Sequence, residues 1–325
     1  MKHALITGAL GQDGQYLSEL LLEKGYRVFG LVRRMGHCAV DGVEYIYGDL
    51  RDELSLRTAI RKSWPDEIYN LGGQVYVPVS WEAPADTFDV NVGGLLRILK
   101  IVEQIKRETR VYQASSSEMF GNHSGVLNEL SPLSPVSPYG EAKAAAHRIA
   151  ARYRERGLFV VGGILFNHES PRRGHEMVTR KIACHVAGWA VGDKSMLLLG
   201  NMDSKRDWGF AGDYVRAMHL MLQQSEPEDF VIGTGVSHSV RDFLFTACRV
   251  AGIDAEFAVN HVQQDVRLKR DAEIYDLRAN AKHAKLFMGW EPKVNFQELV
   301  ELMVNSEISR LARLRNETAM HWATT

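Results

Sequence analysis

Short apolar runs alternate with longer amphipathic segments over the first half of the chain. The apolar runs are rich in β-branched and aromatic residues, which favours buried strands, and they cover residues 3–7, 27–32, 44–47, 67–71, 110–114 and 158–166. Most of the segments between them are long enough for a helix. This alternation is typical of βαβ units, so the pattern predicts an α/β fold with a parallel sheet.

The segment that follows the first strand has the clearest helical pattern. Leu17, Leu20, Leu21 and Leu22 fall on one broad face of a helix, which would bury against the sheet. Gly25 comes next, and glycine is a typical C-terminal cap because it adopts the left-handed conformation without strain. We therefore expect the first helix to end there.

The pattern changes after about residue 166. A charged loop, a helix and a short strand extend to about residue 200, a strand-like run follows at 230–235, and helical patterns cover about 239–251 and 295–315. No repeat, low-complexity stretch or linker separates the two halves. These features predict a first domain over residues 1–165, to which 205–235 return, and a smaller interleaved C-terminal domain over 166–325 that mainly binds substrate. Ligands usually bind in the cleft between such parts.

Composition excludes several classes of protein. The chain has 325 residues, of which 45% are hydrophobic and 24% charged, with a formal net charge of −1, so no nucleic-acid or anionic-membrane partner is expected. No stretch approaches the roughly 18 apolar residues of a membrane span, and the N-terminal apolar run is too short for a signal peptide. Cys38, Cys184 and Cys248 have neither disulfide nor zinc spacing. We expect a cytoplasmic protein with reduced thiols and no bound metal.

Three spaced glycines lie between the first strand and the first helix. Gly8, Gly11 and Gly14 stand in LITGALGQDGQYL, where they would allow a tight turn and the close approach of a pyrophosphate to the helix N-terminus. A spaced-glycine motif alone is weak, but its place after an apolar strand and before a strong helix favours a dinucleotide site over a simple turn. Gln12 and Asp13 belong to the same turn and are assigned to the same site. The first domain is therefore predicted to be a Rossmann-type, doubly wound parallel sheet.

The residues after the next two strands bear on which dinucleotide binds. NAD-binding folds place an acid about 20 residues after the glycines to bind the ribose, whereas an arginine accommodates a 2′-phosphate. Arg33 and Arg34 end the second strand and the next acid is Asp41, so NADP is favoured over NAD; the alternative is a solvated basic pair. Asp49, after the third strand, is placed to contact adenine or to serve as an acid at a helix N-terminus. Leu50 beside it is assigned to the cofactor site.

A second group of candidates follows the fifth apolar run. The segment ASSSEMFG places Glu118 directly after three serines; serines commonly satisfy backbone groups in a turn, but that explanation does not account for the glutamate. Tyr139 and Lys143, in SPYGEAK, are four residues apart on a predicted helix and share one face. A nearby ammonium would lower the pKa of the phenol by stabilising phenolate, and the tyrosine could then remove a proton from a sugar hydroxyl.

Together these motifs resemble the extended short-chain dehydrogenase/reductase family, which acts mostly on nucleotide sugars. The resemblance covers almost the whole chain and is closest to the GDP-mannose 4,6-dehydratase branch, through ITGALGQDG, QASSSEMFG, SPYGEAK, GILFNHESPRRG, VTRKI, LGNMDSKRDWGFAGDYVRAMHLMLQQ and MGWEPKVNFQELV. FNHESPRRG and KRDWG are more specific to that branch than the glycines or the Tyr-Lys pair. The resemblance implies an NADP-dependent lyase that converts GDP-D-mannose to GDP-4-keto-6-deoxy-D-mannose.

The same resemblance implies a role for each catalytic candidate. Tyr139, with Lys143 beside it, takes the C4 hydroxyl proton while a hydride passes to the nicotinamide. Glu118 then removes the C5 proton, which the C4 ketone has made acidic, and assists the loss of the C6 hydroxyl as water; the hydride returns to C6. Ser116 matches the residue that bonds the C4 oxygen, usually threonine in the family, so we expect the same role with a looser orientation. The 4-epimerases of this fold have no task for a carboxylate at this place.

Substrate contacts follow from the resemblance as well. It assigns Arg206 and Arg270 to the diphosphate of the GDP-sugar, for which a bidentate guanidinium is well suited. It assigns Glu273 to a ribose hydroxyl and Asn167 and Lys181 to other substrate contacts.

Alternatives stay open at three points. GDP-D-glycero-D-manno-heptose 4,6-dehydratases share these motifs, and QVYVPVSWEAP departs from the residues usual beside the sugar pocket, which weakens the choice of mannose. The loop after Arg34 is shorter than in most members, where it reaches a neighbouring subunit; a homodimer or homotetramer is expected. Some members of this fold bind NADP and catalyse nothing, but these typically lack the tyrosine or the lysine.

Overall fold

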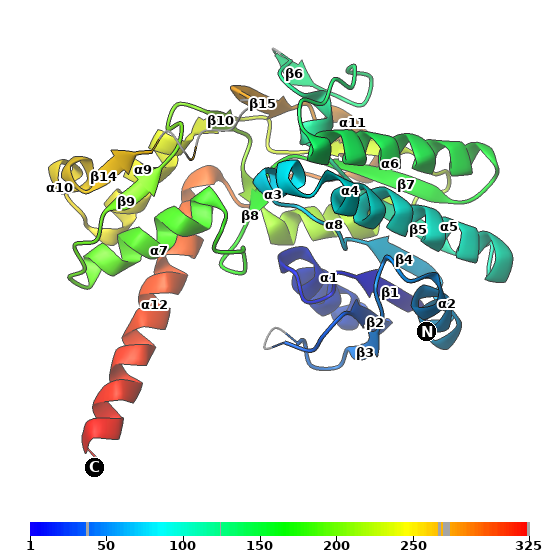
Figure 1. Ribbon diagram of the computed structural model, residues 1–325, viewed down its shortest axis with the longest axis horizontal. Helices are drawn as coiled ribbons and strands as arrows, with labels where there is room; N and C mark the ends of the chain where they lie inside the picture. The colour runs from blue at the N-terminus through cyan, green and yellow to red at the C-terminus, as the bar shows by residue number, and fades with distance from the viewer. Residues whose placement is uncertain (37–38, 124, 266–267, 269–273, 324–325) are drawn as a thin grey trace.

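The chain folds around a seven-stranded parallel sheet. The computed structural model describes residues 1–36, 39–123, 125–265, 268 and 274–323. The strand order is β12-β7-β5-β4-β1-β2-β3 (Figure 1). The order changes direction between β1 and β4, so the predicted Rossmann-type, doubly wound α/β fold is confirmed. The strands are β1 (His3–Thr7), β2 (Arg27–Val32), β3 (Glu44–Tyr47), β4 (Glu67–Asn70), β5 (Arg110–Ser116), β7 (Val160–Leu165) and β12 (Asp229–Ile232).

The register of the sheet brings the candidate segments to one edge. Thr7, at the end of β1, pairs with Leu31 and Asn70 of the neighbouring strands. Ser116, at the end of β5, pairs with Leu165. Because the strands are parallel, the loops that follow all these residues leave from the same side, where ligands bind in open α/β sheets.

Helices cover both faces of the sheet. α1 (Gln12–Glu23), α8 (Ala211–Leu222) and α11 (Lys282–Met288) pack on one face, and α2 (Glu53–Ser63), α5 (Gly94–Ile105) and α6 (Pro138–Glu155) pack on the other. In α1, Leu17 and Leu21 are fully buried and Leu20 and Leu22 pack at the margin of the same core, as predicted. Gly25 follows the helix with a φ of +78°, which confirms it as the terminating residue.

A second group of elements packs beside the sheet. Its helices α7 (Val178–Ala190), α9 (Val240–Ala251) and α12 (Phe296–Ala323) share one apolar core. The shorter elements are β6 (Val126–Leu127), β8 (His168–Glu169), β9 (Leu197–Leu199), β10 (Lys205–Arg206), β11 (Gly209–Phe210), β13 (His238–Ser239), α10 (Ala255–Asn260), β14 (Val262–Gln264) and β15 (Asp276–Ala279). They form a four-stranded sheet, β13-β10-β15-β6, and two strand pairs, β11-β8 and β14-β9. The domain boundaries given above stay a prediction.

Two parts of the chain differ from the sequence pattern. The connection between β4 and α5 contains two short helices and a π-helical turn, α3 (Val77–Glu82), α4 (Pro84–Phe88) and η1 (Asp89–Gly93), none of which was predicted. α12 continues to Ala323, past the expected end near 315, and extends away from the body of the molecule (Figure 1). Near the expected end, Arg313, Leu314 and Arg315 are exposed, and Arg315 Nη2 donates to the Val191 carbonyl oxygen.

None of the helices in the described residues has both the length and the apolar content to cross a membrane. Within the same residues, no group of three or more His, Cys, Asp and Glu side chains is placed to hold a metal ion. Cys184 and Cys248 are unpaired thiols, and Cys38 lies outside the described residues.

Candidate active site

A cavity of about 340 Å³ lies at the carboxyl edge of the sheet, a volume typical of ligand pockets. It brings together eight of the residues predicted from sequence: Asp13, Ser116, Glu118, Tyr139, Lys143, Asn167, Lys181 and Arg206. The other described candidates are not in its lining; they are Gly8, Gly11, Gln12, Gly14, Arg33, Arg34, Asp49 and Leu50. Arg270 and Glu273 lie outside the described residues.

The first turns of α6 position the predicted tyrosine and lysine. Ser137 caps this helix by accepting a hydrogen bond from the Gly140 amide at 3.1 Å, and Pro138 stands at its first position. Tyr139 and Lys143 are both buried, and the lysine Nζ lies 5.8 Å from the centre of the tyrosine ring. The prediction that the two side chains share one helix face is therefore confirmed.

The expected lowering of the tyrosine pKa is wrong. Burial raises the pKa of Tyr139 to about 12, because the apolar surroundings disfavour phenolate. A hydrogen bond with Ser116 lowers this pKa in part, whereas the negative charge of Glu118 raises it further. The Lys143 ammonium donates to the Ala114 carbonyl oxygen at 2.9 Å, and burial lowers its own pKa to about 8.

The end of β5 carries the serine and the glutamate. The strand runs into a single 3₁₀ turn, η2 (Ser117–Phe120), in which Ser116 Oγ accepts a hydrogen bond from the Glu118 amide at 3.2 Å. Gly121 ends the turn with a φ of +66°, and a Cβ there would lie 1.8 Å from the Ser134 carbonyl oxygen. The turn is thus fixed at both ends, and the bond to Glu118 N restrains the Ser116 hydroxyl that we expected to be loosely oriented.

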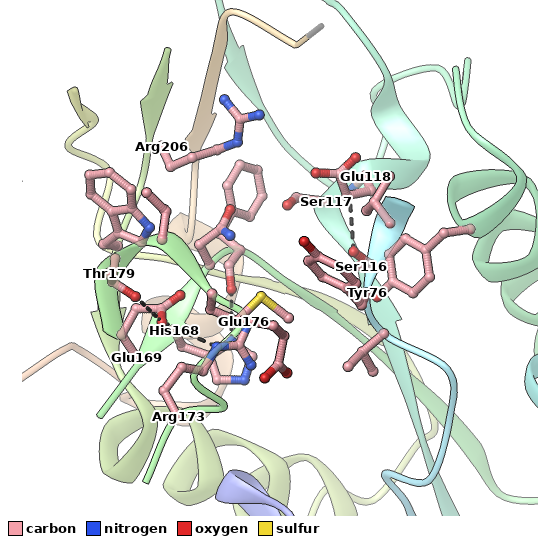
Figure 2. A pocket seen from close by; sticks show the side chains of 18 of the residues that line it. Tyr76, Ser116, Ser117, Glu118, His168, Glu169, Arg173, Glu176, Thr179 and Arg206 are labelled. Carbon is pink, nitrogen blue, oxygen red and sulfur yellow. Dashed lines mark hydrogen bonds and ion pairs between the residues drawn. The ribbon is translucent and has the colours of Figure 1, made fainter. Parts of the chain in front are cut away.

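Two walls of the cavity face each other in Figure 2. Ser116, Ser117, Glu118 and Tyr76 lie on one wall, and Arg206, His168, Glu169, Arg173 and Thr179 lie on the other. Glu118 is 8% exposed. Its negative charge raises the pKa of Tyr139, and both side chains line the same cavity. A buried acid next to a buried phenol is an arrangement suited to proton transfer.

The glycine turn has the shape that a bound phosphate requires. Gly8 has a φ of +69°, and a Cβ on it would lie 2.9 Å from the Gly72 amide nitrogen. A Cβ on Gly14 would lie 2.4 Å from the Gly8 carbonyl oxygen, so the helix and the turn touch through their backbones. No side chain caps α1 at Gly11, which leaves the positive end of this helix available to an anion. The turn therefore fits a dinucleotide cofactor.

The side chains of Gln12 and Asp13 form hydrogen bonds with other protein groups. Gln12 Nε2 donates to the His168 carbonyl oxygen at 3.1 Å and its Oε1 accepts from Ser170 Oγ at 2.8 Å. Asp13 Oδ2 lies 2.8 Å from His168 Nε2. Burial of both groups opposes their charges, but the ion pair outweighs it: the pKa of Asp13 is lowered and that of His168 is raised. The pair joins α1 to β8.

Of the candidates after β2 and β3, the charged ones reach the surface. Arg33 and Arg34 are exposed beyond the end of β2. Asp49 is bound by Arg51 through two side-chain contacts, at 3.0 and 3.2 Å, and this hydrogen bonding lowers the pKa of the carboxyl. The side chain that caps the following helix α2 is that of Asp52. Leu50 is buried.

The three described substrate candidates line the other side of the cavity. Arg206 Nη1 donates to the carbonyl oxygens of Lys205 and Ile274, both at 2.8 Å. Lys181 Nζ donates to the Leu198 carbonyl oxygen at 2.6 Å. The Asn167 carbonyl oxygen accepts from the Gly209 amide at 2.9 Å, which fixes the backbone at this position. Backbone contacts thus anchor all three residues at the cavity wall.

Comparison with known sequences places this arrangement in a family. The family described as GDP-mannose 4,6 dehydratase matches residues 5–303. GDP-mannose 4,6 dehydratase 1 of Arabidopsis thaliana is 45% identical over 96% of this chain and 91% of its own length. The chain belongs to the GDP-mannose 4,6-dehydratase family. The human GDP-mannose 4,6 dehydratase is 43% identical over 94% of the chain and 91% of its own length, and the Yersinia enterocolitica protein of that name is 42% identical over 95% of both.

Solved structures support the same fold. A Thermus thermophilus UDP-glucose 4-epimerase in complex with NAD is 27% identical, with a TM-score of 0.84 over 94% of this chain and 98% of that chain. A Bacillus anthracis dTDP-glucose 4,6-dehydratase in complex with NAD is 20% identical, with a TM-score of 0.81 over 94% and 96%, and shows the fold alone.

Several charged residues of this family member were missed from the sequence. Glu169 is buried and accepts a hydrogen bond from Thr179 Oγ1 at 2.6 Å, and Arg173 Nε lies 3.1 Å from the same carboxylate (Figure 2). The Arg173 charge in turn lowers the pKa of Tyr139. The available signal was the density of charge in FNHESPRRG directly after a buried strand; only the asparagine of that segment was assigned.

Proposed function

We propose that this protein is a GDP-mannose 4,6-dehydratase, which converts GDP-D-mannose to GDP-4-keto-6-deoxy-D-mannose. Membership of the family supports the substrate and the reaction. The observation that carries the proposal is the sharing of one cavity by Glu118 and Tyr139, with Ser116 and Lys143. A 4-epimerase needs the phenol but has no task for an acid beside it.

A nicotinamide cofactor held at the glycine turn supplies a hydride acceptor that later returns the hydride. The residues that would hold it are the backbone of Gly8, Gly11 and Gly14, with Lys143 at the nicotinamide side. We further propose that the cofactor is NADP, because Arg33 and Arg34 are exposed just after β2, and an arginine after the second strand of this fold can accommodate a ribose 2′-phosphate.

The side chains of the cavity then divide the proton transfers. Tyr139 accepts the C4 hydroxyl proton, and the Lys143 ammonium stabilises the phenolate that this step requires. Ser116 bonds the C4 oxygen and orients it. Once C4 is a ketone, Glu118 removes the C5 proton and delivers it to the C6 hydroxyl, which leaves as water. Glu118, protonated again from solvent, returns a proton to C5 as C6 receives the hydride, and Tyr139 releases to solvent the proton that it took from the C4 hydroxyl. The net change is therefore the loss of one water.

Residues on the opposite wall would hold the nucleotide. Arg206 is suited to the diphosphate, and Lys181 and Asn167 are suited to polar groups of the nucleotide sugar. Arg270 and Glu273, assigned by resemblance to the diphosphate and a ribose hydroxyl, belong to the same proposal and lie outside the described residues.

Incubation with GDP-mannose and NADP tests the proposal directly. The expected result is a product lighter by one water in mass spectrometry, with the alkaline absorbance of a 4-keto sugar. Tyr139→Phe is the matched control and should give neither signal. An unchanged substrate in the presence of correctly folded, NADP-loaded protein would refute the proposal.

A heptose is the second candidate substrate. Val75, Tyr76, Val77 and Pro78 line the cavity from α3 and the turn before it, and this segment departs from the family pattern. Turnover of GDP-D-glycero-D-manno-heptose without turnover of GDP-mannose would select the heptose dehydratase.

A further inference from the structure

A series of largely buried polar side chains, Ser115, His147 and Asp229, lies behind the end of β5. The reaction steps above do not use it. His147 is on α6, four residues after Lys143, so it extends the helix face that carries Tyr139 and Lys143. Its Nδ1 lies 3.0 Å from Ser115 Oγ, and its Nε2 lies 3.6 Å from Asp229 Oδ2. The imidazole therefore connects β5 to β12 on the face of the sheet that α6 covers.

Asp229, at the far end of this series of polar side chains, is itself held in place by hydrogen bonds. Asp229 accepts hydrogen bonds from the Gly162 amide at 2.9 Å and from Arg154 Nη1 at 3.1 Å. A Cβ on Gly162 would lie 2.5 Å from Asp229 Oδ1 and 2.9 Å from His147 Nδ1. A glycine inside a buried strand is unfavourable by itself. Here it provides the space that the histidine and the aspartate fill.

The charges around the imidazole decide which nitrogen carries the proton. The Asp229 carboxylate favours a proton on Nε2, which leaves Nδ1 free to accept from the Ser115 hydroxyl. Burial lowers the pKa of His147; Asp229 opposes this shift, and Arg154 and Arg148 add to it. The neutral ring, in which Nδ1 can accept from the Ser115 hydroxyl, is thus the favoured form near neutral pH.

Ser115 lies between Ala114 and Ser116, the two residues that contact Lys143 and Tyr139. The Ala114 carbonyl oxygen accepts from Lys143 Nζ at 2.9 Å, and Ser116 bonds the Tyr139 hydroxyl. We propose that His147 is a positioning residue that acts through Ser115: with the Asp229 carboxylate facing its other ring nitrogen, it fixes the end of β5 so that both contacts keep their geometry. This inference rests on the proposed function, because Tyr139 and Lys143 have catalytic roles only there.

The test compares Ser115→Ala with His147→Phe, and the two combined. Misplacement of a catalytic group by about 1 Å can cost on the order of a hundredfold in rate, so we expect kcat to fall roughly ten- to hundredfold in each single variant, with little change in KM. The double variant should lose no more than the worse single variant, because both changes break one bond. His147→Gln, whose amide oxygen can still accept from Ser115, should recover part of the kcat.

His219→Phe is the matched control. His219 is also a largely buried histidine whose pKa burial lowers, but its Nε2 lies 3.4 Å from the Tyr26 hydroxyl, at the amino end of the sheet. Its kcat should equal that of the wild type. Thermal unfolding of every variant separates a loss of positioning from a loss of folded protein.

Two outcomes would overturn the inference. The first is a Ser115→Ala variant with wild-type kcat, and the second is a double variant whose loss is the product of the single losses. If the wild type itself fails on GDP-mannose, the proposed function fails separately. In that case the ¹⁵N shifts of the His147 ring, which need no substrate, still decide: a proton on Nδ1 in place of Nε2 refutes the arrangement.

Discussion

At position 118 a carboxylate and an amide occupy nearly the same space, but only the carboxylate accepts a proton. Glu118→Gln should therefore leave C4 oxidation possible and stop the loss of water, with a fall in kcat of roughly 10²- to 10⁴-fold. Product mass and transient reduction of the cofactor measure the two steps separately. Glu141→Gln, on the exposed side of α6, is the control and should retain wild-type kcat. Equal rates in wild type and Glu118→Gln would end this assignment.

The pKa of Lys143 predicts a limit on the alkaline side. Burial lowers it to about 8, so the ammonium is lost as the pH rises through this value and phenolate formation at Tyr139 loses its cation. We expect kcat/KM, which reports the free enzyme, to fall above pH 8. Lys143→Arg, whose guanidinium does not titrate there, should be slower and should lack this break.

A lysine far from the cavity serves as the control for that profile. Lys106 is also buried and binds Asp66 at the amino end of the sheet. Lys106→Arg should keep the break near pH 8. A break that persists in Lys143→Arg would mean that a group other than Lys143 causes it.

At the residue scale, the sequence predicted which residues belong to the site better than it predicted their burial and pKa values. Spacing placed Tyr139 and Lys143 on one helix face, but the sign of the tyrosine pKa shift was wrong because spacing carries no measure of burial. Glu169 and Arg173 were missed for the same reason. Each looks like a surface charge in the sequence, and only the contact with Thr179 shows the carboxylate to be buried.

At the element scale, the ion pair between α1 and β8 should make one histidine titrate unusually. The pKa of His168 is raised because the Asp13 charge outweighs burial, so its contribution to stability is complete below about pH 6.5, the unfolded value, and is lost as the pH rises through the folded pKa. In Asp13→Asn burial and the Arg173 charge still lower the pKa of His168, opposed only by its hydrogen bond to the Phe166 carbonyl oxygen, so the pKa should drop below 6.5. NMR titration of the His168 ring measures it; an unchanged pKa would contradict the pairing.

The last helix offers a test of packing in adjacent residues. On α12, Met303 is fully buried in the core shared with α7 and α9, whereas Leu302 is 43% exposed. Met303→Ala should lower the free energy of unfolding by about 2–5 kcal/mol, and Leu302→Ala by no more than about 0.5 kcal/mol. Denaturant unfolding compares the two. Equal losses would mean that this part of α12 does not pack as described.

Except for the C-terminal end of α12, elements with a regular pattern were predicted to within a few residues, and the irregular ones were not. All six apolar runs became strands of the central sheet, and the run at 230–235 became β12. The short helices between Val77 and Phe88 were missed because Pro78 and Pro84 suggest breaks, although proline is tolerated at the first turn of a helix. Two-residue strands such as β8 depend on their partners and leave no periodic signal.

For the whole molecule, the edge of the sheet bearing Arg33 and Arg34 should decide the cofactor. The combined change Arg33→Glu and Arg34→Glu should raise the Kd for NADP roughly ten- to hundredfold, the equivalent of losing a charged hydrogen bond, with less effect on NAD. The same change of charge at Arg61 and Lys62, exposed on α2, is the control. An NADP preference that persists would place the 2′-phosphate contact elsewhere.

Assembly is the other property of the whole molecule that sequence raised. A homodimer or homotetramer remains the prediction, and the loop after Arg34 that bears on it includes residues outside the described ranges. Light scattering of the purified protein distinguishes these states. Sequence pattern could not decide between them, because subunit contacts lack the periodicity that identifies a core.

The order of the strands also matters for synthesis. β12, which covers β7 at the border of the central sheet, comes from residues 229–232, long after β7 itself. A nascent chain that has just left the ribosome as far as residue 165 therefore presents β7 with its outer row of amide and carbonyl groups unpaired. Translation that stalls in this interval should yield the most aggregation-prone intermediate of the protein, and chaperones should engage the chain most strongly there.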